Sequence, residues 1–126
     1  MTENKCYCGS AKGFQDCCEP LIKGAEKAST AESLMRSRYS AYATHAVDYL
    51  MATTHPSERK YHSKSEILNW AVSNQWLKLE IVNATENIVE FKAYFRDHLL
   101  VEQIHHEKST FKFENGSLYY VDGVFY

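Results

Sequence analysis

The four cysteines of this 126-residue chain all fall within one short N-terminal stretch, at Cys6, Cys8, Cys17 and Cys18. Zinc prefers four soft ligands in a tetrahedral arrangement, and four thiolates supply them. A bridge within either close pair would be strained, and bridges between the pairs would need an oxidising compartment. The spacing therefore predicts one metal ion held by four thiolates. We expect zinc, and the spacing leaves iron as an alternative.

The residues between the cysteines fit a metal knuckle. Gly9 allows the turn that points both of the first two thiolates inward. Ser10 can donate a hydrogen bond to a sulfur, and Phe14 begins a short helical turn that presents the second pair. Because protein thiolates fill every position, we expect a structural site, whereas a catalytic zinc keeps one position open for water.

Three segments behind the cysteines have the apolar spacing of helices. They cover residues 31–46, residues 47–53 and a stretch that begins behind a cap at Ser63 or Ser65. Ser29 or Thr30 is expected to cap the first of them, and residues 20–27 are expected to be a connector. The third should bury an apolar side made of Ile67, Leu68, Ala71 and Val72.

Strand periodicity follows in the second half of the chain, in residues 76–82, 89–95, 99–113 and 118–121. Asn115-Gly116 indicates a tight type I′ turn between the last two strands. Helices followed by an antiparallel meander predict the α+β class. We therefore expect a zinc knuckle in residues 1–24 and an α+β domain in residues 25–126.

Composition and charge exclude several classes of protein. With 44% hydrophobic and 24% charged residues, the chain has the composition of a globular domain rather than a disordered one. A net charge of −2 argues against broad nucleic-acid binding, which needs a basic surface. The N-terminus lacks the apolar segment of a signal peptide, and no apolar run reaches the length of a membrane span. We therefore expect a cytoplasmic protein.

The stretch from Cys6 to Cys18, CYCGSAKGFQDCC, resembles the SEC-C motif, the zinc-binding tail of the translocation ATPase SecA. The likeness covers the ligands, their spacing, the Gly-Ser step, a basic residue and an aromatic residue. Tyr7 stands where Pro is usual, and Ala11 stands where Gly is usual. Neither position is a ligand, so the resemblance implies zinc binding by the same four cysteines.

Further segments resemble the YchJ-like family. They are LMRSRYSAY at 34–42, DYL at 48–50, THP at 54–56, HEKSTF at 106–111 and YYVDG at 119–123. This resemblance implies a SEC-C knuckle followed by a nuclear-transport-factor-2-like, or cystatin-like, domain. In that fold helices pack on a curved antiparallel sheet, whose concave side often forms a pocket.

Arg38 is the most informative charged residue, because it lies on the apolar face of the first predicted helix. A buried guanidinium needs an acidic partner, and Glu107, Glu102 and Asp122 are the candidates. We favour a structural ion pair that ties the helix to the sheet over an anion-binding or catalytic arginine in a pocket. Tyr42 is expected in the core with its hydroxyl at a pocket rim. His55, before Pro56, is expected to cap a helix.

Two functions fit these features. The first is a zinc-binding accessory or interaction protein that docks on the ribosome or on protein-export components through its knuckle, with Lys5, Lys12, Lys23 and Lys27 around the contact. The second is a hydrolase or isomerase that acts on a small molecule in the concave pocket, which predicts a cavity with converging polar groups. No nucleophile motif or phosphate loop occurs, so we favour the first. Redox sensing through Cys17 and Cys18 is a third interpretation, and it requires oxidation to eject the metal reversibly.

Overall fold

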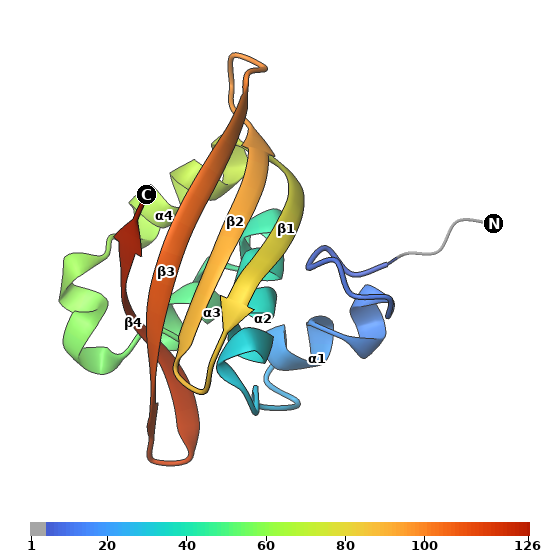
Figure 1. Ribbon diagram of the computed structural model, residues 1–126. Helices are drawn as coiled ribbons and strands as arrows, with labels where there is room; N and C mark the ends of the chain where they lie inside the picture. The colour runs from blue at the N-terminus through green and yellow to red at the C-terminus, as the bar shows by residue number, and fades with distance from the viewer. Residues whose placement is uncertain (1–4) are drawn as a thin grey trace.

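The computed structural model describes residues 5–126, so residues 1–4 of the expected knuckle lie outside the described part (Figure 1). The helical elements are η1 (Phe14–Asp16), α1 (Glu19–Ile22), α2 (Ala31–Thr44), α3 (Val47–Ala52), η2 (Pro56–Tyr61) and α4 (Lys64–Ser73). The strands are β1 (Gln75–Ala84), β2 (Ile88–Arg96), β3 (Glu102–Glu114) and β4 (Ser117–Phe125). Helices therefore precede strands, as the sequence predicted.

The four strands form one antiparallel sheet in the order β1-β2-β3-β4, and Figure 1 shows it twisting alongside the helices. Alternate residues of β2 are buried at Val89, Phe91 and Ala93, as expected for a strand with one face on the core. Asn115 and Gly116 have φ values of 53° and 82°, the left-handed conformations that a type I′ turn requires. The predicted hairpin between β3 and β4 is confirmed.

Helix α2 forms the central contact between the helical layer and the sheet, packing against β1, β2 and β4. It begins where the sequence predicted, because the Thr30 hydroxyl accepts a hydrogen bond from the Ser33 amide at 3.0 Å. It ends at His45, whose φ of 64° is left-handed. Among the helices of residues 5–126, none is long and apolar enough to cross a membrane.

Two local expectations were wrong. Glu19–Ile22 forms α1, which runs into the connector expected at residues 20–27, because Pro20 occupies the first turn of a helix, where its missing N–H costs nothing. The predicted apolar side of α4 is only partly buried, since Leu68 is 37% exposed and Val72 is 51% exposed. Instead, Trp70 extends from α4 toward the sheet, and its ring centroid lies 4.9 Å from that of Trp76.

Candidate functional site

The sulfur atoms of Cys6, Cys8, Cys17 and Cys18 all lie within 4.8 Å of one another. The Sγ of Cys17 lies 3.7 Å from that of Cys8 and 3.9 Å from that of Cys18. In a tetrahedral zinc site with Zn–S bonds of about 2.3 Å, neighbouring sulfurs are roughly 3.8 Å apart. A disulfide would need about 2.05 Å, and all four thiols are free. The four cysteines are therefore placed to bind one metal ion.

Short backbone contacts fold the knuckle around these sulfurs. The Cys6 amide donates to the Lys12 carbonyl at 2.9 Å, and the Gly9 amide donates to the Cys6 carbonyl at 3.1 Å. Gly9 has a φ of 90°, so the tight turn uses the freedom of glycine. The turn η1 then brings Cys17 close, and its amide donates to the Phe14 carbonyl at 3.1 Å.

Hydroxyl groups contact the sulfurs from two directions. The Ser10 hydroxyl donates to the Cys17 sulfur at 3.2 Å from within the knuckle. The Ser40 hydroxyl lies 3.5 Å from the Cys6 sulfur and comes from α2. Such outer contacts orient thiolate ligands and tune a bound metal. The sequence indicated the role of Ser10, but it gave no sign that α2 would reach the cluster.

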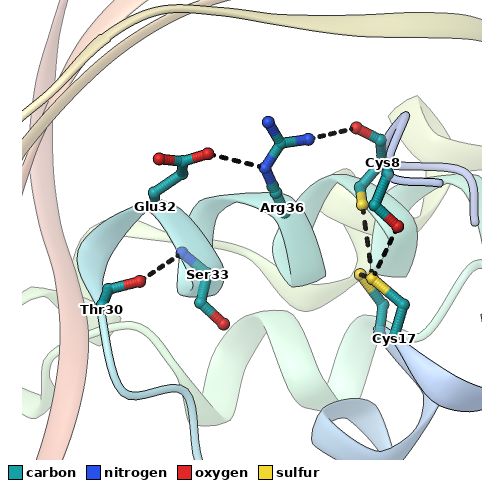
Figure 2. Close-up of polar contacts among 8 residues, drawn as sticks. Cys8, Cys17, Thr30, Glu32, Ser33 and Arg36 are labelled. Atoms are coloured by element: carbon teal, nitrogen blue, oxygen red, sulfur yellow. Dashed lines mark hydrogen bonds and ion pairs between the residues drawn. The ribbon is translucent and has the colours of Figure 1, made fainter. Parts of the chain in front are cut away.

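Arg36 ties the knuckle to α2, as Figure 2 shows. Its Nη1 donates to the Cys8 carbonyl at 2.8 Å, and its Nε donates to Glu32 on the same helix at 3.0 Å. The guanidinium is thereby held between the Glu32 carboxylate, one turn away, and the backbone carbonyl of Cys8, one of the four clustered cysteines. The i, i+4 spacing of Glu32 and Arg36 is typical of such a pair on a helix, but no sequence signal indicated the contact of Arg36 with Cys8.

The knuckle shares its core with the α+β domain. Cys6, Cys8 and Cys18 are 5%, 0% and 1% exposed. They belong to the same buried cluster as Leu34, Met35, Tyr39 and Leu79, which lie on α2 and β1. Figure 1 shows the N-terminal segment beside α2. A metal bound here would therefore fasten the N-terminal segment to the domain.

Without a cation, the thiols of the cluster differ strongly in acidity. The neighbouring thiol of Cys18 lowers the pKa of Cys8 from 9.0 to about 4. In turn, the neighbouring Cys8 raises the pKa of Cys18, and burial raises it further. Burial also raises the pKa of Cys17. The thiols of Cys17 and Cys18 therefore keep their protons more strongly than that of Cys8, so a divalent cation must displace these protons to bind there.

The donor set fits a structural metal. Four sulfurs close together leave no position for a water molecule, and sulfur donors suit zinc and other thiophilic ions. Cys6, Cys8, Cys17 and Cys18 would hold the ion. It would cross-link the knuckle rather than take part in a reaction.

A separate cavity of about 180 Å³ lies between α2, α4 and the sheet. Its walls include Arg38 and Tyr42 from α2, Trp70 from α4, and Glu107 and Tyr120 from the sheet. The concave side of the sheet thus holds a space with converging polar groups, which the enzyme alternative requires. None of the cysteines lines it.

Arg38 is 6% exposed but forms no ion pair, since no carboxylate of residues 5–126 lies within 4.0 Å of its guanidinium. Its Nη1 donates instead to the Leu50 carbonyl at 3.0 Å and to the Thr53 hydroxyl at 2.7 Å. Its guanidinium carbon lies 4.5 Å from the ring centroid of Tyr120. In place of the expected ion pair, carbonyl and hydroxyl oxygens and an aromatic face hold the charge.

Glu107 is also buried and is held by three donors. It accepts hydrogen bonds from His105 at 2.8 Å, from Ser109 at 2.7 Å and from the Tyr120 hydroxyl at 2.9 Å. Burial acts to raise the pKa of Glu107, but these three hydrogen bonds outweigh it, and the pKa falls below 4.5. Arg38 and Glu107 therefore meet through Tyr120, which contacts both.

The other two candidate residues occupy different places. Tyr42 lines the cavity, and burial raises its pKa. His55 is not among the cavity residues. It caps η2 by accepting a hydrogen bond from the Ser57 amide at 3.2 Å, and its Nε2 lies 2.6 Å from Glu114. The sequence had indicated capping for His55.

Several polar cavity residues were not singled out in the sequence, among them His105, Ser109 and Tyr120. The signal for the first two was strand alternation, because residues two apart on a strand share a face with Glu107. Glu107 and Phe111 lie on the same face of β3. Tyr120 pairs with Phe111 across β3 and β4, so it lies on that face and can reach Glu107. A register shift between Thr110 and Phe111 sets this pairing, and no sequence pattern indicated the shift.

Comparisons with known proteins agree with this architecture. Residues 30–123 match the family model described as YchJ, middle NTF2-like domain. A UPF0225 protein of Geobacter sulfurreducens is 42% identical, over 95% of this chain and 78% of that protein. Another from Photorhabdus laumondii is also 42% identical, over 98% and 82%.

Two solved structures share the fold. A SEC-C motif containing protein from Rhodopseudomonas palustris has a TM-score of 0.87 and 37% identity, and the match covers 94% of this chain and 96% of that one. A sec-c motif containing protein from Psychrobacter arcticus has a TM-score of 0.77 and 34% identity, with 97% and 81% covered. The nuclear-transport-factor-2-like fold expected from the sequence is confirmed. The chain belongs to the YchJ-like (UPF0225) family of proteins, which combine a SEC-C motif with this fold.

Proposed function

We propose that the protein is a zinc-binding accessory protein whose knuckle docks on a protein partner or on the ribosome. The observation that carries the metal part is the sulfur cluster, in which four thiols lie within 4.8 Å of one another and two of the separations match a tetrahedral site. The two structural relatives named for the SEC-C motif support it. Iron is the competing ion at a site of four thiolates.

Elemental mass spectrometry on untagged protein, purified without any chelator, measures the metal content and tests this part of the proposal. We expect one zinc per chain, with four thiols that react only after the metal is removed. Iron would replace zinc in the proposal. Four freely reactive thiols and no metal would overturn it.

The outer surface of the knuckle supports docking. Tyr7 is 50% exposed, and its ring centroid lies 5.3 Å from that of Phe14, which makes an edge-to-face pair on the surface. Exposed aromatic residues are enriched at protein interfaces, where they supply large rigid contacts. Lys5 and Lys12 are exposed on the same knuckle and suit an acidic partner. The aromatic pair and the two lysines form the contact surface in this proposal.

Tyr7→Ser tests docking without touching a metal ligand. We expect it to lose ribosomal or protein-export components in pull-downs from a bacterial lysate, while its zinc content stays at one per chain. Tyr61→Ser is the matched control, because Tyr61 is 71% exposed on η2, away from the knuckle sequence. Equal recovery of every component by the wild type and by both variants would contradict docking through this surface.

A further inference from the structure

The cavity of the α+β domain combines a buried charge with aromatic walls. Apart from Arg38, Glu107 and their polar neighbours, its lining is largely apolar, including Trp70, Phe91 and Phe125. Small-molecule sites typically pair such walls with a few placed polar groups. The metal-binding and docking functions use none of these residues.

Arg38 has donors to spare inside this cavity. Only its Nη1 finds hydrogen-bond acceptors among residues 5–126, and its Nε and Nη2 find none. No fully buried side-chain nitrogen or oxygen of these residues lacks a partner, so both atoms keep some accessible surface. Arg38 is only 6% exposed as a whole residue, and it lines the cavity. A guanidinium in this setting is matched to a planar anion such as a carboxylate, which accepts from Nε and Nη2 together.

Glu107 limits the charge of what can bind. Its two carboxylate oxygens already accept three hydrogen bonds, and it lines the same cavity as Arg38 from the opposite element, the sheet. The lining offers one arginine to balance an anion, and taking a dianion such as a phosphate ester out of water costs more than taking out a singly charged carboxylate. At the packing density of proteins, a cavity of 180 Å³ holds roughly 130 Å³ of van der Waals volume, about the size of benzoate.

We propose that this cavity binds a small organic monocarboxylate, with its carboxylate on Arg38 and its apolar body against Trp70, Phe91 and Phe125. The site lies apart from the cysteine knuckle, so it extends the function of the protein beyond metal binding and docking. Tyr42 and His62 also line the cavity and are available to contact the bound molecule.

Binding is tested by titrating ¹⁵N-labelled, metal-loaded protein with acetate, isovalerate, cyclohexanecarboxylate and benzoate at constant ionic strength and pH. Benzamide is the neutral partner of benzoate. We expect benzoate or cyclohexanecarboxylate to bind with saturable shifts at the amides of Phe91 and Ala93, and benzamide to bind at least about tenfold more weakly, since a charged hydrogen bond is lost. No saturable shift with any of the four acids at millimolar concentration overturns the proposal, as does equal binding of benzamide.

Two variants with matched controls locate the site. Arg38→Gln should abolish binding, while Arg96→Gln, on the exposed end of β2, should keep it. Since Arg38→Gln removes contacts that hold α3, Ala93→Leu provides a second route: it fills the cavity and leaves Arg38 in place. Ala25→Leu, at an exposed site, is its control. Undiminished benzoate binding by a folded Ala93→Leu protein would overturn the location. Failure of the carboxylate proposal would leave the metal and docking proposals unaffected.

Discussion

Removal of the proposed metal ion should destabilise the whole domain and not only the knuckle. Cys6, Cys8 and Cys18 lie in the same buried cluster as residues of α2 and β1. Without a cation, no bond cross-links the four sulfurs, and short hydrogen bonds such as that of the Cys6 amide to the Lys12 carbonyl hold the knuckle together. The binding free energy of a structural metal is folding free energy, so the metal-free knuckle should release from α2 and expose the apolar surface beneath it.

The size of the effect follows from what the knuckle covers. Leu34, Met35, Tyr39 and Leu79 are each less than a tenth exposed and belong to the cluster that contains the cysteines. Full burial of such a side chain contributes about 1.5–3 kcal/mol, so uncovering half of each of the four costs about 3–6 kcal/mol. For a domain of this size, that corresponds to a fall in Tm of roughly 10–25 °C.

Thermal unfolding followed by far-UV and near-UV circular dichroism, before and after chelation, measures this fall. Near-UV signals report on Trp76, whose ring centroid lies 6.0 Å from that of Tyr39. Adding zinc back should restore the original Tm, and Cys17→Ser protein should respond little to the chelator. An unchanged Tm after complete release of the metal would refute the reasoning, because it would show that the knuckle adds nothing to the stability of the domain.

Three further predictions concern single side chains. Ser10→Ala removes the hydrogen bond to the Cys17 sulfur and should weaken metal affinity by about 10–100-fold in competition with a chelator. Leu50→Ala, at a site 1% exposed, should lower the free energy of unfolding by about 2–5 kcal/mol in urea titrations. Glu107→Gln should cost about 2–4 kcal/mol near neutral pH, because three hydrogen bonds lose their charged acceptor. The folded pKa of Glu107 lies below 4.5, so the difference in unfolding free energy between wild type and variant should reach its full value above pH 4.5. It should shrink as the pH falls through the folded pKa. Urea titrations at several pH values measure this dependence.

The sequence predicted best those elements whose caps and turns are formed by residues close together in the chain. Thr30 caps α2 through its side chain, and the Asn115-Gly116 turn adopts the conformation that these residue types favour. Helix α4 was predicted correctly as a helix but not in its buried face. Which face is buried depends on where the sheet lies, and the aromatic contact of Trp70 with Trp76 joins separate elements.

The candidate sites divide in the same way. The clustering of the cysteines follows from their short spacing, which leaves the chain few ways to separate them. The contacts of Arg36 and Ser40 with the knuckle depend on how α2 docks, and nothing within the helix specifies that. Arg38 was expected to pair with Glu107, Glu102 or Asp122, but it contacts the ring of Tyr120, whose hydroxyl donates to Glu107. The register of β3 and β4 places Tyr120 there.

Helix α2 carries contacts to both sites on different faces. Arg36 and Ser40 are four residues apart and reach the knuckle, while Arg38 and Tyr42, also four apart, line the cavity. Two positions along a helix turn it by about 200°, so the two pairs point nearly opposite ways. A change at the metal can then reach the cavity by moving α2 on the sheet, together with Met35, which belongs to the buried cluster of the cysteines and also lines the cavity. Benzoate binding by metal-free protein would show that α2 keeps its place without the knuckle, and its loss on chelation would show that the metal holds α2 in register.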